Sequence, residues 1–263
     1  MKWLDAYDLK ARVLPAAVVG SPLMTLGAAA CFSLFDVGAK SISSAAVIGL
    51  GVLYAFSQLV VRGAGADLEK QLWLDWDGAP STRTVRWRDN TLGRDLKQRI
   101  HERVEQKFSV KLASEPDETA NPDAADTVIN DAFRQVRVLL RHKAPKGLWF
   151  VHNTEYGFLR NVLGSCRIWI ILSGCSAFIT GSVYGVTAQP LWAVACVMDL
   201  GLATTAFLLC RGPLRRLCKH AADRYAESAW VAFLSVTDNK SSSGEASHSS
   251  SATRNRKTKA AQT

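Results

Sequence analysis

The chain has 263 residues, of which 48% are hydrophobic and 21% charged, and its formal net charge is +9. The basic excess is uneven: it is +1 over residues 1–12, +3 over residues 62–167, which hold eighteen Lys and Arg against fifteen Asp and Glu, and +6 from residue 211 onwards. A central segment so nearly balanced in charge argues against nucleic-acid binding, which calls for a strong basic patch.

Four long apolar stretches, two on each side of the charged centre, are the main feature of the sequence. Residues 13–35 and 41–61 contain no charged side chain, and residues 168–210 contain only Asp199. About 20 helical residues cross a hydrocarbon layer of ~30 Å, so the first two stretches predict one span each. The third stretch is too long for one span, and Gln189-Pro190 divides it into two.

The segments outside these spans predict helices and no β-strand. From Leu92 to Phe108 an apolar residue recurs every four positions, which is typical of an amphipathic helix. Residues 113–122 are acidic and turn-rich and predict a loop. The predicted all-α organisation comprises a cytoplasmic lead-in (1–12), a transmembrane hairpin (13–62, spans 13–35 and 41–61), a cytoplasmic helical domain (63–166), a second hairpin (167–211, spans 168–186 and 190–210), an amphipathic cytoplasmic helix (212–236) and a disordered tail (237–263).

The positions of the basic residues predict the orientation. Short flanks rich in Lys and Arg stay in the cytoplasm, and those nearest the span ends count most. We therefore expect both termini and the central domain to lie in the cytoplasm of a bacterium, with the spans in its inner membrane. The basic residues beside the span ends are Lys10, Arg12, Arg62, Arg160, Arg167, Arg211, Arg215, Arg216 and Lys219.

The six cysteines contain no C-x-x-C pair and no spacing typical of a metal site. Buried thiols behave as small apolar residues and the cytoplasm keeps thiols reduced, so we expect no disulfide framework. The segment from Ala28 to Cys31 faintly resembles a lipoprotein processing site. The charge-free run continues through Phe35, which favours an uncleaved span over a cleaved signal.

Asp199 is the most informative single residue, because an ionised carboxylate at the middle of a span costs ~2.5–3.5 kcal/mol. Its helical neighbours Ala195 and Ala203 form a ridge of small residues on which another helix can pack closely. The side chain either belongs to an ion or proton pathway or makes a structural hydrogen bond to a hydroxyl of another span. We favour the structural contact, because no basic residue lies at matching depth in any span.

A second ridge of small residues runs along the third predicted span at four-residue spacing. Such a ridge lets two helices approach closely, either within one chain or between copies in a homo-oligomer. We favour packing within the chain. The ridge consists of Ser173, Ala177, Gly181 and Gly185.

Two polar segments beside the membrane are candidate contacts for a ligand or for lipid phosphates. The first places the guanidinium groups of Arg83, Arg86 and Arg88 beside the indole of Trp87, and membrane lipid is the favoured partner. In the second, Tyr156 and Arg160 share a helix face just before the third span. The simpler interpretation of this second segment is a helix entry with aromatic anchors.

No sequence motif indicates catalysis. The chain contains no phosphate-binding loop, dinucleotide-binding fingerprint, zinc-protease motif or nucleophile elbow, and its five histidines are scattered. We therefore expect a protein that is not an enzyme and that needs no cofactor or metal.

Several segments in a fixed order resemble a family of uncharacterised bacterial integral membrane proteins. They are Leu9-Lys10-Ala11-Arg12-Val13-Leu14-Pro15, residues 76–83, residues 86–89, residues 155–161 and residues 221–227. The resemblance covers most of residues 1–235 and implies no catalytic residue. A looser likeness, of architecture alone, links the chain to four-span effectors of nucleotide-signalled bacterial defence.

Three functions remain open at this point. The first is an inner-membrane protein whose cytoplasmic helical domain acts on self-associating spans, as in a pore-type or signalling effector. The second is a membrane-anchored scaffold or assembly factor that recruits a cytoplasmic protein through residues 92–143. The third is a small transporter that uses Asp199.

Overall fold

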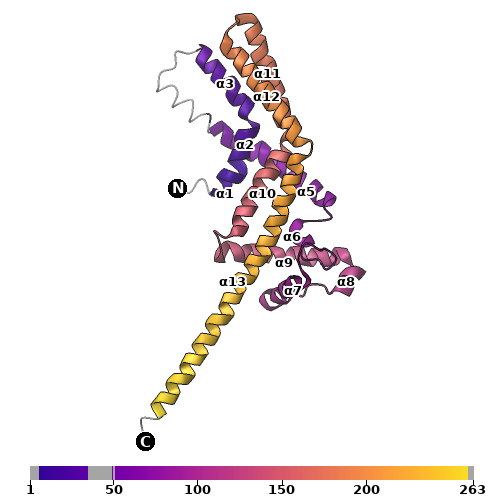
Figure 1. The fold of residues 1–263 in the computed structure, drawn as a ribbon, viewed down its shortest axis with the longest axis vertical. Helices are drawn as coiled ribbons and strands as arrows, with labels where there is room; N and C mark the ends of the chain where they lie inside the picture. Colours follow the sequence, from indigo (N-terminus) through magenta and orange to yellow (C-terminus); the bar gives the residue numbers. More distant parts are fainter. Residues whose placement is uncertain (1–5, 35–48, 50, 260–263) are drawn as a thin grey trace. The chain divides into compact units, whose positions relative to one another are not determined.

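The computed structural model describes residues 6–34, 49 and 51–259, and within them every regular element is a helix (Figure 1). This agrees with the predicted all-α class. The helices are α1 (Ala6–Asp8), the π-helical turn η1 (Leu9–Val13), α2 (Leu14–Val19), α3 (Ser21–Leu34), the π-helical turn η2 (Ser57–Val61), α5 (Arg62–Asp75), α6 (Pro80–Arg83), α7 (Arg94–Phe108), α8 (Glu115–Ala120), α9 (Pro122–Lys143), α10 (Leu148–Gly164), α11 (Cys166–Thr187), α12 (Pro190–Cys210) and α13 (Pro213–Lys259).

The chain divides into two compact units. Unit 1 comprises Met1–Trp76 and Asn153–Ala222, and unit 2 comprises Asp77–His152 and Asp223–Thr263. The long apolar helices belong to unit 1, whereas the amphipathic helices α7 and α9 belong to unit 2.

Unit 1 contains two helices, α11 and α12, that are long and apolar enough to cross a membrane. A third candidate is the pair Leu9–Val19 and Ser21–Ser33, which is bent by 59° at Gly20. Residues 41–48 and 50 of the predicted second span, residues 41–61, lie outside the described residues. The structure therefore gives two to three candidate spans, and the fourth stays a prediction.

The turn between α11 and α12 follows from its residues. Ala188 ends α11 in the left-handed conformation at φ 51°, and Pro190 starts α12, where its missing N–H costs nothing. This hairpin confirms that the third apolar stretch consists of two helices.

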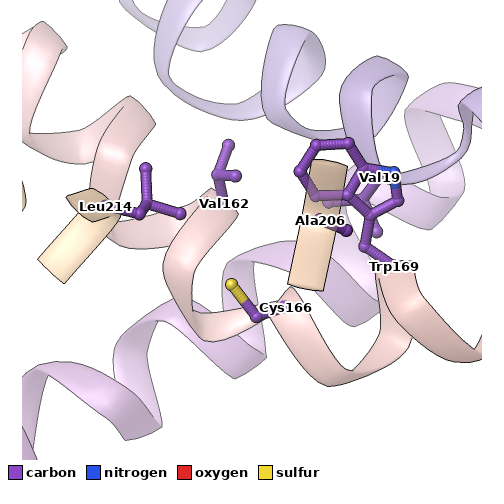
Figure 2. Packing of buried hydrophobic residues seen from close by; sticks show 6 residues of the cluster. All are labelled: Val19, Val162, Cys166, Trp169, Ala206 and Leu214. Atoms are coloured by element: carbon purple, nitrogen blue, oxygen red, sulfur yellow. The ribbon is translucent and has the colours of Figure 1, made fainter. Parts of the chain in front are cut away.

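Two apolar clusters hold unit 1 together. The larger one joins five helices, α2, α10, α11, α12 and α13, and Trp169 is its largest member (Figure 2). The smaller one joins Ala29 of α3 to Trp192 and Ala195 of α12. The members of the larger cluster are Val19, Val162, Cys166, Trp169, Ala206 and Leu214.

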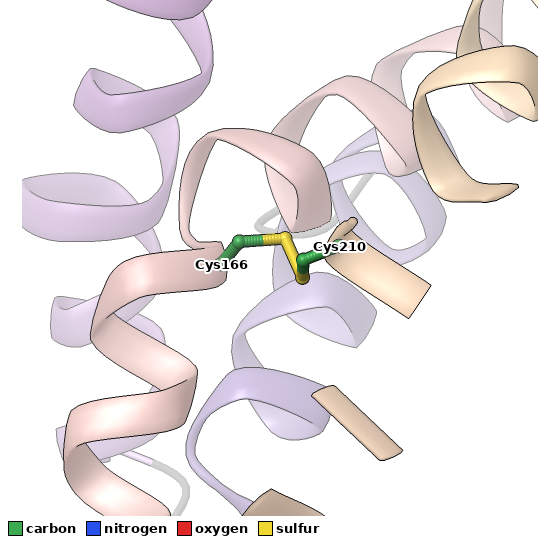
Figure 3. Close-up of a disulfide and its surroundings, with 2 residues drawn as sticks. All are labelled: Cys166 and Cys210. Atoms are coloured by element: carbon green, nitrogen blue, oxygen red, sulfur yellow. A yellow bond between two sulfur atoms is a disulfide. The ribbon is translucent and has the colours of Figure 1, made fainter. Parts of the chain in front are cut away.

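Cys166 and Cys210 form a disulfide, so the prediction of free thiols was wrong (Figure 3). The two residues are 44 positions apart, and Ala188 lies midway between them in the sequence. An antiparallel hairpin therefore brings them to the same level. Their Cα atoms are 6.0 Å apart, within the range that a disulfide spans.

Unit 2 has a core of aliphatic and aromatic side chains. Ile100 and Val104 of α7 are buried, as the four-residue periodicity predicts. Phe133 of α9 packs against Trp230 of α13, with ring centroids 5.2 Å apart. Phe108 of α7 stacks on Phe233 of α13 with ring centroids 5.6 Å apart.

Two boundaries differ from the sequence prediction. The predicted loop 113–122 contains α8, whose N-cap Ser114 accepts a hydrogen bond from the Asp117 amide, with three acidic residues in the first turn. Acids in a first turn favour a helix start through its dipole, a signal that outweighs the turn residues. Helix α13 continues to Lys259, beyond residue 236 where the sequence predicts a disordered tail. The sequence there has no apolar periodicity, and such a helix is marginal in water.

Candidate functional site

Asp199 lies fully buried in α12 and contacts two other helices of unit 1. The Ser176 hydroxyl of α11 donates to Asp199 Oδ2 at 2.6 Å. The Thr25 hydroxyl of α3 donates to Asp199 Oδ1. Sequence reasoning anticipated a hydroxyl partner but could not name these two residues.

Both hydroxyls have a second acceptor, the backbone carbonyl of Pro22. Thr25 Oγ1 lies 2.8 Å and Ser176 Oγ 3.0 Å from the Pro22 oxygen. A hydroxyl carries one proton and can donate to only one of its two acceptors at a time. The Asp199 cluster (Pro22, Thr25, Ser176 and Asp199) can therefore adopt alternative hydrogen-bond arrangements without repacking.

The proton count of the cluster depends on the carboxyl group. An ionised carboxylate can take both hydroxyl protons, one on each oxygen. A protonated carboxyl donates to one hydroxyl, which is then free to donate to the Pro22 carbonyl.

The predicted ridge of small residues in α11 is used mainly within the chain. Ser173 and Ala177 are buried, and a Cβ added at Gly181 would lie 3.3 Å from the Cys196 sulfur of α12. Gly185 is exposed, and a Cβ there would meet nothing within 4 Å. In α12, Ala195 is buried beside α3 and Ala203 is half-buried.

Arg86 is the centre of an ionic network in unit 2, and only 3% of its side chain is exposed. Its Nε donates to Asp126 Oδ1 at 2.7 Å, and its Nη2 pairs with the other oxygen of that carboxylate. Its Nη1 donates to the Asp77 carboxylate at 2.8 Å and to the Asp77 carbonyl at 2.5 Å. Gly78, at φ 111°, leaves room for the guanidinium, because a Cβ there would lie 2.5 Å from Nη2.

The other members of the Arg83–Arg88 segment also face partners inside unit 2. Arg83 pairs with Asp223 at 2.5 Å, and Arg88 lies 3.6 Å from Glu118. Glu118 also accepts the Trp87 backbone amide at 2.9 Å. A phosphate that bound these guanidinium groups would have to compete with carboxylates already in contact. The sequence showed the arginines but not which distant carboxylates they meet.

Two further side chains, those of Lys97 and His101, contact the same segment. The Lys97 ammonium donates to the backbone carbonyl of Arg86 at 2.6 Å and to that of Asp89, and burial lowers the pKa of Lys97. His101 packs against Trp87 with ring centroids 4.6 Å apart, and burial lowers the pKa of His101. Neither residue was a candidate from the sequence.

Tyr156 and Arg160 belong to unit 1, so the six candidate contacts fall into two separate sets. Both side chains contact Glu69 of α5: the Tyr156 hydroxyl donates to Glu69 Oε1 at 2.9 Å, and Arg160 Nη1 lies 3.0 Å from the same oxygen. Burial and the Glu69 charge raise the pKa of Tyr156. Burial alone lowers the pKa of Arg160, but Glu69 and neighbouring phenols together raise it overall.

Cys218 lies near this group and was not a candidate from the sequence. Burial, opposed by the Arg160 charge, raises the pKa of the Cys218 thiol to about 12. A thiol with such a pKa is protonated at neutral pH and is a poor nucleophile. The geometry is that of a structural polar cluster.

Among the residues that the structure describes, no three His, Cys, Asp or Glu side chains are grouped as a metal site would require. A scan against protein-family models and searches of curated proteins and of solved structures match nothing to this chain. The resemblance to bacterial membrane proteins therefore stays a prediction.

Proposed function

We propose that the chain is a four-span, non-enzymatic protein of the bacterial inner membrane, in which a cytoplasmic helical unit acts on self-associating spans. Its termini and unit 2 face the cytoplasm in this proposal, as the basic residues beside the span ends favour. The function is that of a signalling or pore-type effector.

The Asp199 cluster is the observation that carries the proposal. A carboxyl group in a span is costly and usually functional. Here it contacts hydroxyls of two other helices, and each hydroxyl has a second acceptor within 3.0 Å. A contact with two hydrogen-bond arrangements gives the bundle a local two-state element, which a switching protein requires.

The outer face of the hairpin supports self-association. Phe178 and Val186 of α11 are 76% and 87% exposed, and a Cβ added at the nearby Gly185 would meet nothing within 4 Å. A small residue flanked by large apolar ones suits close packing against the helix of a second copy.

Flux through reconstituted vesicles tests the proposal. The full chain should release entrapped ions from vesicles and should cross-link as an oligomer. Asp199→Asn should reduce release at least about tenfold, since an amide offers one acceptor oxygen to the two hydroxyl groups that Asp199 contacts. Ser176→Ala should reduce release as well. Ser182→Ala is the matched control, because this exposed hydroxyl bonds only to the Phe178 carbonyl of its own helix, at 2.8 Å.

Two outcomes would count against the effector. Vesicles that stay sealed and a chain that remains monomeric would exclude both pore formation and self-association. Release that persists undiminished in Asp199→Asn would remove the cluster from the mechanism.

A membrane-anchored scaffold is the second candidate, favoured by the ionic network around Arg86. The network ties Arg86 and Arg88 to Glu118 of α8 and Asp126 of α9, so part of residues 92–143 is held in place without a partner. A protein partner recruited through residues 92–143 would bind Asp199→Asn as well as the parent chain, and a pull-down from native membranes distinguishes the two candidates.

A further inference from the structure

A hollow of about 310 Å³ lies in unit 1 between the end of α5 and the start of α13. Asp75 and Trp76 line it on one side. The other side consists of the first turns of α13 and the residue before them. The lining residues on that side are Gly212, Arg215, Arg216 and Lys219.

The charge of the hollow is strongly positive. Three cations and one carboxylate line it, which gives a net charge of +2. Arg215 pairs with Asp75, which holds its guanidinium across the hollow. Within the described parts of the chain, Arg216 and Lys219 have no carboxylate partner, and both are exposed. Lys219 follows Arg216 by three positions and Arg215 by four, so the three cations lie on one side of the helix.

The hollow lies close to the end of a candidate span. Helix α12 ends at Cys210, and the lining residues that follow it begin with Gly212, the residue before α13. At 1.5 Å per residue, this places Gly212 to Lys219 about 3–14 Å beyond the apolar helix, the depth of lipid head groups. Trp76 is a residue type that prefers this interface.

We infer that this hollow binds the phosphate group of an anionic membrane lipid. Guanidinium groups match phosphate oxygens in geometry, and an ammonium group adds a point charge. Basic pockets beside membrane helices recognise anionic head groups in this way. The inference goes beyond the proposed effector function and requires only that α12 crosses a membrane.

The test compares lipid binding by full-length variants. In native mass spectrometry from detergent, the parent chain should retain phosphatidylglycerol in preference to phosphatidylcholine. The double variant Arg216→Gln/Lys219→Gln should lose at least about tenfold in phosphatidylglycerol affinity, because each basic residue near a lipid surface contributes substantially to binding. Both side chains are exposed, so circular dichroism and melting of the variant should match the parent.

The control variant removes two positive charges from unit 2 instead of from the hollow. Lys107→Gln/Lys111→Gln changes two exposed lysines of unit 2 and should leave the lipid affinity within twofold. Asp75→Asn should increase the affinity, because it removes the one anion of the hollow. Equal losses in the two double variants, or no preference for the anionic lipid, would overturn the inference. Full displacement of the lipid by millimolar inorganic phosphate would overturn the assignment to a lipid rather than to free phosphate.

Discussion

Replacing Arg86 by Met should lower the free energy of local unfolding of unit 2 more than the replacement of an exposed charged residue does. Removing one partner of a buried, hydrogen-bonded ion pair costs about 3–5 kcal/mol, because the other partner is left without compensation. Asp126 keeps 23% exposure and a second guanidinium, that of Arg88, at 3.7 Å. We therefore expect the lower end, about 3 kcal/mol, which corresponds to about a hundredfold change in an equilibrium constant.

Hydrogen exchange of the full chain in detergent measures this effect locally. Peptides covering residues 80–91 and 122–143 should exchange about a hundredfold faster in Arg86→Met, since exchange reports local opening. Arg134→Met is the matched control, because its pair with Asp131 is 65% and 60% exposed and such pairs contribute ~0–1 kcal/mol. Equal protection in the two variants would refute the argument that Arg86 organises the segment.

Two further predictions concern a close approach in unit 1 and a titrating group in unit 2. Gly65→Ala should lower the melting temperature, because the added Cβ would lie 2.1 Å from Asn161 Oδ1 and overpacking costs about 1–3 kcal/mol. Gly63→Ala should leave the melting temperature unchanged, because a Cβ there would meet nothing within 4 Å. Because burial lowers the pKa of His101, the unfolded chain takes up a proton below about pH 6.5 that the folded chain resists. Stability measured by hydrogen exchange should therefore fall from pH 7 towards pH 5, and His101→Gln should flatten that dependence.

The sequence was sufficient where the signal is local. Apolar periodicity predicted α7, and the Gln189-Pro190 break predicted two helices in the last apolar stretch, because backbone hydrogen bonding and burial act over a few residues. Partners far apart in the chain gave no such signal. Arg86 meets Asp126 at a separation of 40 residues, and Asp199 meets Thr25 at 174.

Missed partners share one physical cause. The central segment contains fifteen acidic residues, and the sequence does not show which of them lies within ion-pair distance of a given arginine. That depends on how the helices pack. Glu69 shows this most clearly: Tyr156 and Arg160 were singled out as one helix face, but the acid that both contact lies 87 residues before Tyr156. The disulfide is different, because the symmetry of a hairpin about Ala188 could have predicted it.

The redox state of Cys166 and Cys210 in living cells tests the proposed orientation. Both cysteines lie at the hairpin end that carries Arg167 and Arg211, which the proposal places in the cytoplasm. The structure holds the pair in the oxidised form, whereas the cytoplasm keeps thiols reduced. If the proposed orientation is right, cells quenched in acid and then alkylated should therefore yield both residues as alkylated thiols. In isolated membranes, oxidised glutathione should form the bridge by exchange: the two thiols lose two hydrogens and two glutathione molecules are released.

The geometry makes the bridge accessible without repacking, since the Cα atoms already lie 6.0 Å apart. Peptide mass spectrometry should therefore find the Cys166–Cys210 link in the oxidised membranes, and Cys210→Ser should abolish it. Recovery of the disulfide from quenched cells would mean that this end faces an oxidising compartment. The basic residues beside the spans would then lie outside, and the orientation derived from them would be wrong.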